Sequence, residues 1–311
     1  MTPSLPPHAE LLPLGAPPQS LEAAIDLRNV LLDWASYDVG NLTEAEFDTL
    51  AATTTVEGSI LVVHPSGSRG MLGITKHADH ARLRAAPGRP VTRFTLSGLG
   101  NSDIGAASLA RSLADFTGEP VGAIVAGYSV ADLWAEGAGG ALFFAEVTRP
   151  AQTLLQARHL AESIMAEALR DPRLRPAPAR HATNAAAETL LRVLGDSDRP
   201  LRTLLAHSRG AVTLAFALQR LALMADPDPF ARIQETQIVT LGAVQRLPGP
   251  LGRARQFLGT LDPFGVLNSR FGVGFEPVAG AGHHLNRALP GALALPDLLA
   301  RVYPSALPHA A

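Results

Sequence analysis

Short apolar runs rich in β-branched residues alternate along this chain with segments of helical periodicity. The run at 121–127 has the composition of a strand buried on both faces. Strands that alternate with crossover helices predict an α/β fold with a mostly parallel, doubly wound sheet covered on both faces. The expected strands are 59–63, 91–97, 121–127, 203–208, 237–244, 256–261 and 274–278. Pro277 confines the last of these strands to a sheet edge, because proline has no N–H to donate.

Helical periodicity separates the strands and also precedes the first of them. Helices are expected over 20–35, 43–51, 104–116, 152–170, 184–194 and 211–224. Residues 1–19 are rich in proline and are expected to form a flexible arm. We expect residues 20–311 to form a single domain with a helical N-terminal segment. Within it, 128–200 is long for one crossover and is expected to include an excursion or flap over one end of the sheet.

The composition limits the chemistry that the chain can perform. A content of 47% apolar and 17% charged residues is typical of a globular protein. A formal net charge of −2, without a basic block, argues against a nucleic-acid partner. The chain has no cysteine, which excludes a thiol nucleophile, an iron–sulfur cluster and a cysteine-based zinc site. Lys76 is the single lysine, so any Schiff base would have to form there.

Nothing in the sequence predicts a membrane segment. The first residues contain no basic region followed by an unbroken apolar stretch, so we expect no secretory signal. The longest apolar runs, such as 211–218, fall well short of a membrane span. We therefore expect a cytoplasmic protein without an integral membrane segment.

The most informative motif is AHSRG at 206–210, between a predicted buried strand and a predicted buried helix. Small residues, Ala206 and Gly210, lie two positions before and two after Ser208. A sharp strand–turn–helix requires small residues there, because larger side chains would collide across the turn. Such a turn lifts Ser208 Oγ out of the sheet and directs the first helix amides, beginning with Arg209, at the same point. The motif therefore predicts a nucleophilic serine beside an oxyanion-binding amide.

An acid and a base follow this serine along the chain. A serine hydroxyl needs a base within hydrogen-bond reach and an acid that orients the base. Asp262 directly follows the predicted strand 256–261, so it should lie at the same carboxyl edge of the sheet as Ser208. His283 and His284 follow the last predicted strand. We expect Asp262 and one of these two histidines to complete a triad with Ser208.

In this order of serine, aspartate and histidine, the chain resembles the α/β-hydrolase superfamily, and its lipase-like and esterase-like serine hydrolases in particular. The resemblance extends from residue 91 to the C-terminus by element order, and its specific motifs lie within 203–286. Two features depart from the family pattern. Ala206 stands where glycine is commoner, and the short stretch between Ser208 and Asp262 leaves no room for a large inserted cap.

The resemblance implies a hydrolase that cleaves carboxylic esters of short to medium acyl chain and needs no cofactor. Ser208 would attack the carbonyl of a small-molecule ester, and the aspartate would hold the base. The Gly-His step after the last strand favours His283 as that base, with His284 as the alternative. The family pattern also places an oxyanion-hole amide in the loop after the third strand, which here is Gly98 and Leu99.

Each of these residues also has a structural interpretation. Ser208 is a favourable helix N-cap, and Asp262 is a common turn residue before proline. Ser129 also follows an apolar strand with small neighbours, and it is the main competing nucleophile. Its other interpretation is a residue that lines the substrate pocket. Ser68 shows a weaker form of the same pattern without a convincing helix after it.

Other segments carry weaker signals. The spacing of His77 and His80 fits two metal ligands, but no third ligand is near in sequence, so we expect a solvated loop and no metal. Trp134 and the phenylalanines at 143–144 could line an acyl pocket, form a flap, pack in a core or meet a second subunit. A homo-oligomer is therefore left open. The glycines at 98–105 lack the full dinucleotide-binding fingerprint.

Two other functions remain open at this stage. A fold does not guarantee its chemistry, so the chain could be a non-catalytic binding protein with a hydrolase fold. The same triad could also transfer an acyl group to an acceptor other than water. The sequence names neither the acyl group nor the alcohol of the ester.

Overall fold

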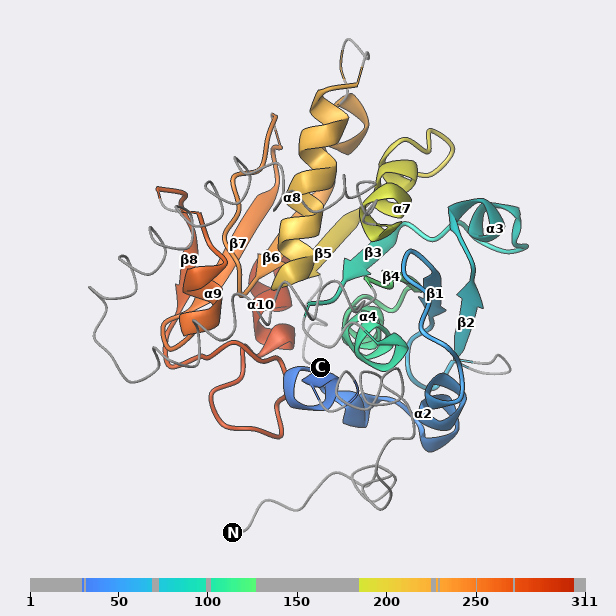
Figure 1. The fold of residues 1–311 in the computed structure, drawn as a ribbon, viewed down its shortest axis with the longest axis horizontal. Helices are drawn as coiled ribbons and strands as arrows, with labels where there is room; N and C mark the ends of the chain where they lie inside the picture. Colours follow the sequence, from blue (N-terminus) through green and yellow to red (C-terminus); the bar gives the residue numbers. More distant parts are fainter. Residues whose placement is uncertain are drawn as a thin grey trace, which may run out of the picture. The chain divides into compact units, whose positions relative to one another are not determined.

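One sheet forms the centre of the described part of the chain. In the computed structural model the described residues are 30–304, apart from 31, 69–72, 99–101, 127–184, 225–227, 229, 250 and 271. Eight strands of this part of the chain form the sheet in the order β2-β1-β4-β3-β5-β6-β7-β8, with β2 at the right and β8 at the left in Figure 1. The strands are β1 (Ile60–Val63), β2 (Ile74–His77), β3 (Arg93–Leu96), β4 (Val121–Ile124), β5 (Thr203–His207), β6 (Gln237–Leu241), β7 (Ala254–Gly259) and β8 (Glu276–Val278).

The sheet is mixed but mostly parallel. The six strands from β4 to β8 in the sheet order are mutually parallel. β1 is antiparallel to both of its neighbours, β2 and β4. The carboxyl ends of β3, β5 and β7 therefore share one edge of the sheet, whereas the carboxyl end of β1 lies at the opposite edge.

Helices connect the strands and cover the sheet. The helices are α2 (Glu44–Ala51), α3 (His80–Ala85), α4 (Asp103–Thr117), α7 (Ala185–Leu194), α8 (Arg209–Ala222), α9 (Pro263–Leu267) and α10 (Leu295–Val302), with the short 3-10 helices η2 (Val39–Asn41) and η3 (Ala231–Ile233). Residues 32–36 are also helical. None of the helices in the described part of the chain has the length and apolar character that crossing a membrane requires.

Apolar side chains pack on both faces of the sheet. Along β5, Leu205 belongs to the apolar cluster that includes α4 and α10, whereas Leu204 and Ala206 belong to the cluster that includes α7 and α8. All three side chains are fully buried. Successive residues of a strand point to opposite faces, so a strand covered on both sides must be apolar at nearly every position. This apolar pattern predicts an α/β protein with a mostly parallel sheet, and the observed sheet confirms that fold class.

Every expected strand is present, most of them shorter than predicted. Pro277 lies in β8 at the edge of the sheet, which confirms the expected position. β2 was not anticipated, because Ile74 is its single strongly apolar residue and its side chains are partly exposed. The short helices α3 and α9 and the C-terminal α10 were not anticipated either. The arm at 1–19 and the helix expected over 152–170 lie outside the described residues.

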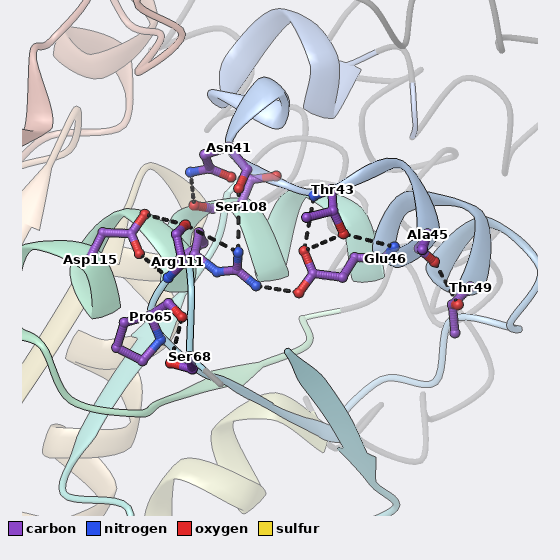
Figure 2. A network of polar contacts seen from close by, with 11 residues as sticks. Asn41, Thr43, Ala45, Glu46, Thr49, Pro65, Ser68, Ser108, Arg111 and Asp115 are labelled. Atoms are coloured by element: carbon purple, nitrogen blue, oxygen red, sulfur yellow. Dashed lines mark hydrogen bonds and ion pairs between the residues drawn. The ribbon is translucent and has the colours of Figure 1, made fainter. Parts of the chain in front are cut away.

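A polar network fastens α4 to the segments around it (Figure 2). The buried Arg111 guanidinium lies 2.5 Å from Glu46 Oε1 of α2 and also donates to Ser66 Oγ. Asn41 Nδ2 donates to the carbonyl of Ser108 at 3.0 Å. Because one cation serves several acceptors, α2, η2 and the turn after β1 are all held against the same helix.

Candidate active site

Ser208 stands at a sharp turn between β5 and α8. Its φ of 54° makes it the one residue other than glycine with a positive φ in the part of the chain that the structure describes. Such a conformation costs on the order of 1–3 kcal/mol, so the surrounding structure must enforce it. The start of α8 approaches β3 so closely that a Cβ on Gly210 would lie 2.3 Å from the carbonyl oxygen of Leu96. Only glycine fits there, and this close packing holds Ser208 at the turn.

Three polar side chains from three separate loops meet at this turn. His283 Nε2 lies 2.8 Å from Ser208 Oγ, and His283 Nδ1 lies 2.9 Å from both carboxylate oxygens of Asp262. The Asp262 side chain is fully buried and that of His283 is 10% exposed. A carboxylate can only accept hydrogen bonds, so the Nδ1–H of His283 donates to Asp262. The other ring nitrogen, Nε2, then accepts a hydrogen bond from the Ser208 hydroxyl. The arrangement can remove the proton of Ser208 while its oxygen attacks an electrophile.

Asp262 is oriented by the helix that it begins. It follows β7 and is the N-cap of α9, with Oδ1 accepting from the Gly265 amide at 2.6 Å. A Cβ on Gly265 would lie 2.3 Å from Asp262 Oδ2, so glycine is required for this close approach. The two interpretations of Asp262, as a turn residue and as the partner of the base, are therefore compatible. Its carboxylate caps α9 and also faces His283.

The loop after β8 carries His283 over Asp262. A Cβ on Gly259, the last residue of β7, would lie 2.2 Å from the carbonyl oxygen of Ala281. This close backbone contact packs the loop on the end of β7. His284, the alternative base, instead has Nε2 at 3.1 Å from the carbonyl oxygen of Pro290. Of the two histidines, it is His283 that faces the serine.

The backbone of Gly98 lies directly against Ser208. A Cβ on Gly98 would lie 2.5 Å from Ser208 Cβ and 3.2 Å from Ser208 Oγ. The Gly98 amide, expected to face an oxyanion, instead donates to Tyr37 Oη at 2.5 Å. Arg209 is the first residue of the 14-residue helix α8, whose positive end therefore begins beside Ser208. Leu99 lies outside the described residues.

Two buried side chains beside the site had no expected role. His207 Nε2 lies 2.8 Å from the carbonyl oxygen of His283, and His207 Nδ1 lies 3.0 Å from Tyr37 Oη. Burial, with His283 as a further cause, lowers the pKa of His207 to about 3, and burial raises the pKa of Tyr37. Both side chains are therefore neutral near pH 7. His207 could have been noticed as the neighbour of Ser208, but Tyr37 has no local signal, since it reaches the site only through tertiary contact.

An exposed apolar side chain lies beside the base. The ring centroids of Phe264 and His283 are 5.8 Å apart. The exposed apolar residues on and near α9 are Leu261, Phe264, Val266, Leu267 and Phe275. A molecule that approaches His283 from this side meets the apolar ring of Phe264.

The other candidate residues lie elsewhere. Ser68 follows β1, which places it at the opposite sheet edge from Ser208, and its hydroxyl donates to the carbonyl of Pro65. Ser129 and Trp134, expected to line the pocket, lie outside the described residues, as do 143–144.

Of the two histidines considered as metal ligands, His77 ends β2 and His80 begins α3. Asp79 caps α3 through the amide of Arg82 at 2.8 Å, and His80 Nε2 lies 3.1 Å from the buried carboxylate of Asp196. No group of three histidine or carboxylate side chains within the described ranges is arranged to hold a metal ion. Lys76 is paired with the buried Asp103 at 2.5 Å.

Comparison of this chain with protein-family models, with curated proteins and with solved structures finds no match. The chemistry of the site is therefore argued from its own geometry. That geometry consists of a strained serine, a base in contact with its hydroxyl and a buried carboxylate in contact with the base.

Proposed function

We propose that this chain is a serine hydrolase of the α/β-hydrolase type that cleaves carboxylic esters. The observation that carries the proposal is the contact of Ser208 Oγ with His283 Nε2 at a backbone turn that is strained. A structural N-cap needs no base and no strain, and the Ser208 side chain makes no capping hydrogen bond to α8. Strain at a nucleophile that meets a base is typical of a catalytic site.

These contacts support a two-step reaction. His283 Nε2 takes the proton of Ser208 as Oγ bonds to the ester carbonyl carbon, and Asp262 stabilises the imidazolium that forms. The imidazolium then gives its proton to the leaving alkoxide, the ester C–O bond breaks, and the alcohol departs. Water attacks the acyl-serine in the same way, with His283 taking its proton. The carboxylic acid leaves and Ser208 regains its hydrogen.

The start of α8 is the natural place for the oxyanion. The positive end of the helix begins at Arg209, directly after the nucleophile, where backbone amides stabilise developing negative charge. Gly98 contributes by lacking a side chain, which lets the loop after β3 lie against Ser208. The Gly98 amide donates to Tyr37 Oη, and Leu99, the other donor expected in this loop, lies outside the described residues.

The apolar residues around α9 favour an uncharged ester. An acyl chain or alcohol that packs on Phe264 gains about 0.8 kcal/mol for each methylene that it buries. We therefore expect kcat/KM for p-nitrophenyl esters to rise from acetate to chains of medium length and then to fall. A flat profile would argue against a defined acyl site.

Labelling with a fluorophosphonate tests the proposed nucleophile directly. We expect the probe to modify Ser208, with the site mapped by mass spectrometry, and Ser208→Ala to abolish both labelling and ester cleavage. Ser68→Ala is the matched control, because it removes a serine hydroxyl with small neighbours at the opposite sheet edge. Labelling of Ser129 in its place would move the nucleophile there. A wild-type chain that is neither labelled nor active on any ester would favour a binding protein, and acyl transfer to an added alcohol would favour a transferase.

A further inference from the structure

We propose that His207 and Tyr37 are positioning residues that hold the backbone around the base and around the Ser208 turn. The proposal rests on the proposed function, and neither residue is assigned a contact with substrate. Tyr37 lies just before η2 and His207 ends β5, and both are buried, with exposed fractions of 1% and 0%. His207 contacts the backbone carbonyl of His283 itself, and Tyr37 contacts the amide of Gly98, which packs against Ser208.

A single set of donors and acceptors satisfies all three contacts. The Gly98 amide donates to Tyr37 Oη, the Tyr37 hydroxyl donates to His207 Nδ1, and His207 Nε2–H donates to the carbonyl of His283. A backbone amide can only donate and a carbonyl can only accept, so the direction of the series is fixed from both ends. A neutral His207 must therefore carry its hydrogen on Nε2.

Protonation of His207 would break this series. An imidazolium donates from both nitrogens, so the Tyr37 hydroxyl would face two donors and its own hydrogen would lose its acceptor. Burial opposes the extra proton, and so do the neighbouring imidazoles of His283, with ring centroids 5.0 Å apart, and of His284. On the other side, the carboxylate of Asp33 opposes ionisation of Tyr37. The groups that face the pair thus keep both of its members neutral.

The Tyr37–His207 pair joins parts of the site that are distant in sequence. It connects the loop after β3, the end of β5 and the loop that carries His283. A displacement of about 1 Å between reacting groups can cost on the order of 100-fold in rate. Loss of the pair should therefore lower kcat and leave KM nearly unchanged, because the pair aligns groups without binding substrate.

Kinetics of Tyr37→Phe, His207→Phe and His207→Gln in the full chain test this role. The concentration of active sites is measured by fluorophosphonate labelling. With p-nitrophenyl butyrate, we expect kcat per labelled site to fall about 10- to 100-fold in the two phenylalanine variants, with KM changed by less than about twofold. His207→Gln keeps an N–H for the His283 carbonyl and should recover much of the loss. Tyr303→Phe is the matched control, since it removes a tyrosine hydroxyl bonded to Thr203 at the other end of β5 and should keep kcat.

NMR of the imidazole nitrogens gives a readout that does not depend on activity. In the wild-type chain, His207 should be the neutral Nε2–H tautomer down to about pH 5, well below the ordinary histidine pKa. An Nδ1–H tautomer, or protonation near the ordinary value, would overturn the proposal. Unchanged kcat in both phenylalanine variants would overturn it as well. A wild-type chain with the expected tautomer but without labelling or ester cleavage would instead remove the proposed function, and with it any catalytic role of the pair.

Discussion

Two polar clusters in this molecule, each with a buried side chain at its centre, differ in how their side chains are held. The Ser208 cluster consists of Ser208, His283, Asp262, His207 and Tyr37, and the Arg111 cluster consists of Arg111, Glu46, Asn41 and Ser66. In the Arg111 cluster a buried cation meets a carboxylate on backbone without a positive φ, and removal of one partner of such a pair destabilises a fold (Figure 2). In the Ser208 cluster the serine hydroxyl is held on strained backbone in contact with the His283 imidazole, and Phe264 lies beside that ring. Buried polar groups occur in both clusters, so strain and the convergence of loops distinguish the Ser208 cluster.

The largest effect should come from Ser208→Ala. We expect kcat for ester cleavage to fall by about six powers of ten, since the bond-forming atom is lost. The melting temperature should stay nearly unchanged. Ser208→Gly should be equally inactive but more stable, by about 1 kcal/mol, because glycine adopts the positive φ without strain. A large loss of stability in Ser208→Ala would show that the hydroxyl has a structural role, as in the Arg111 cluster.

Asp262→Asn should have the second largest effect. The amide can still cap α9, but it cannot hold His283 in the required tautomer, so kcat should fall about 10,000-fold with little loss of stability. Asp79→Asn makes the same change at the N-cap of α3 and should leave kcat unaltered. Equal kcat in the wild type and Asp262→Asn would assign Asp262 to helix capping alone.

Arg111→Met should reverse this pattern. It leaves the mostly buried Glu46 carboxylate without its cation, so the free energy of unfolding should fall by about 3 kcal/mol. Folded protein should keep the kcat of the wild type. Chemical denaturation and steady-state kinetics on the same sample separate the two quantities. A lower kcat in fully folded Arg111→Met would contradict the division between the clusters.

Acid should weaken the two clusters in different pH ranges. The native chain keeps His207 neutral, with a pKa of about 3, whereas the unfolded chain takes up a proton near 6.5. The unfolded state then binds more protons, so stability falls as the pH drops from about 6.5 toward 3, by up to about 1.4 kcal/mol per unit. His80, whose pKa is lowered by burial, acts in the same direction. Denaturation at about pH 7.5 and pH 5 should therefore differ by about 2 kcal/mol less in His207→Gln than in the wild type.

Glu46 belongs to a lower pH range. Burial raises its pKa, but the Thr43 amide and the Arg111 guanidinium together bring it below its ordinary value of 4.5. A lowered carboxyl pKa contributes stability at pH values above the ordinary pKa, and this contribution is lost only as the pH falls below that value.

The His207 prediction has a clear contrary outcome. If the free energy of unfolding fell as steeply between pH 7.5 and 5 in His207→Gln as in the wild type, the low pKa of His207 would be contradicted.

The smallest effect should come from an exposed ion pair. Arg253 and Glu235 lie 2.7 Å apart, with exposed fractions of 59% and 82%. Solvent screens such a pair, so Arg253→Met should change the free energy of unfolding by less than about 1 kcal/mol. If it cost as much as Arg111→Met, burial could not be the source of the difference.

Most of the strands could be predicted from the sequence, because each is a short apolar run that is recognisable without knowledge of the rest of the chain. Leu204 and Leu205 predict a strand covered on both faces, and Gly210 predicts the close approach of α8. The antiparallel direction of β1 could not be predicted, since its residues would look the same in either direction. β2 was missed because its exposed side chains lack an apolar pattern.

The residues of the candidate site that directly follow a strand could be predicted from the sequence, whereas those that reach it through long-range contacts could not. Ser208, Asp262 and His283 each follow a recognisable strand, so their types and order carry the information. Tyr37 follows no such pattern, and its contact with His207 spans 170 positions of the chain. The Gly98 amide was assigned to the oxyanion because nothing local shows that a distant hydroxyl takes it. Long-range hydrogen bonds are set by packing and have no periodicity in the sequence.

The two edge strands of the described sheet, β2 and β8, affect whether copies of this chain can associate by strand pairing at high concentration. A long, flat outer strand offers its backbone as a template on which another molecule can add a strand and start an aggregate. β8 has three residues, and its middle one, Pro277, has no N–H to offer. At the other end of the sheet, β2 carries the charged Lys76. We therefore expect crowded copies to touch through side-chain surfaces, and the sheet to end within one molecule.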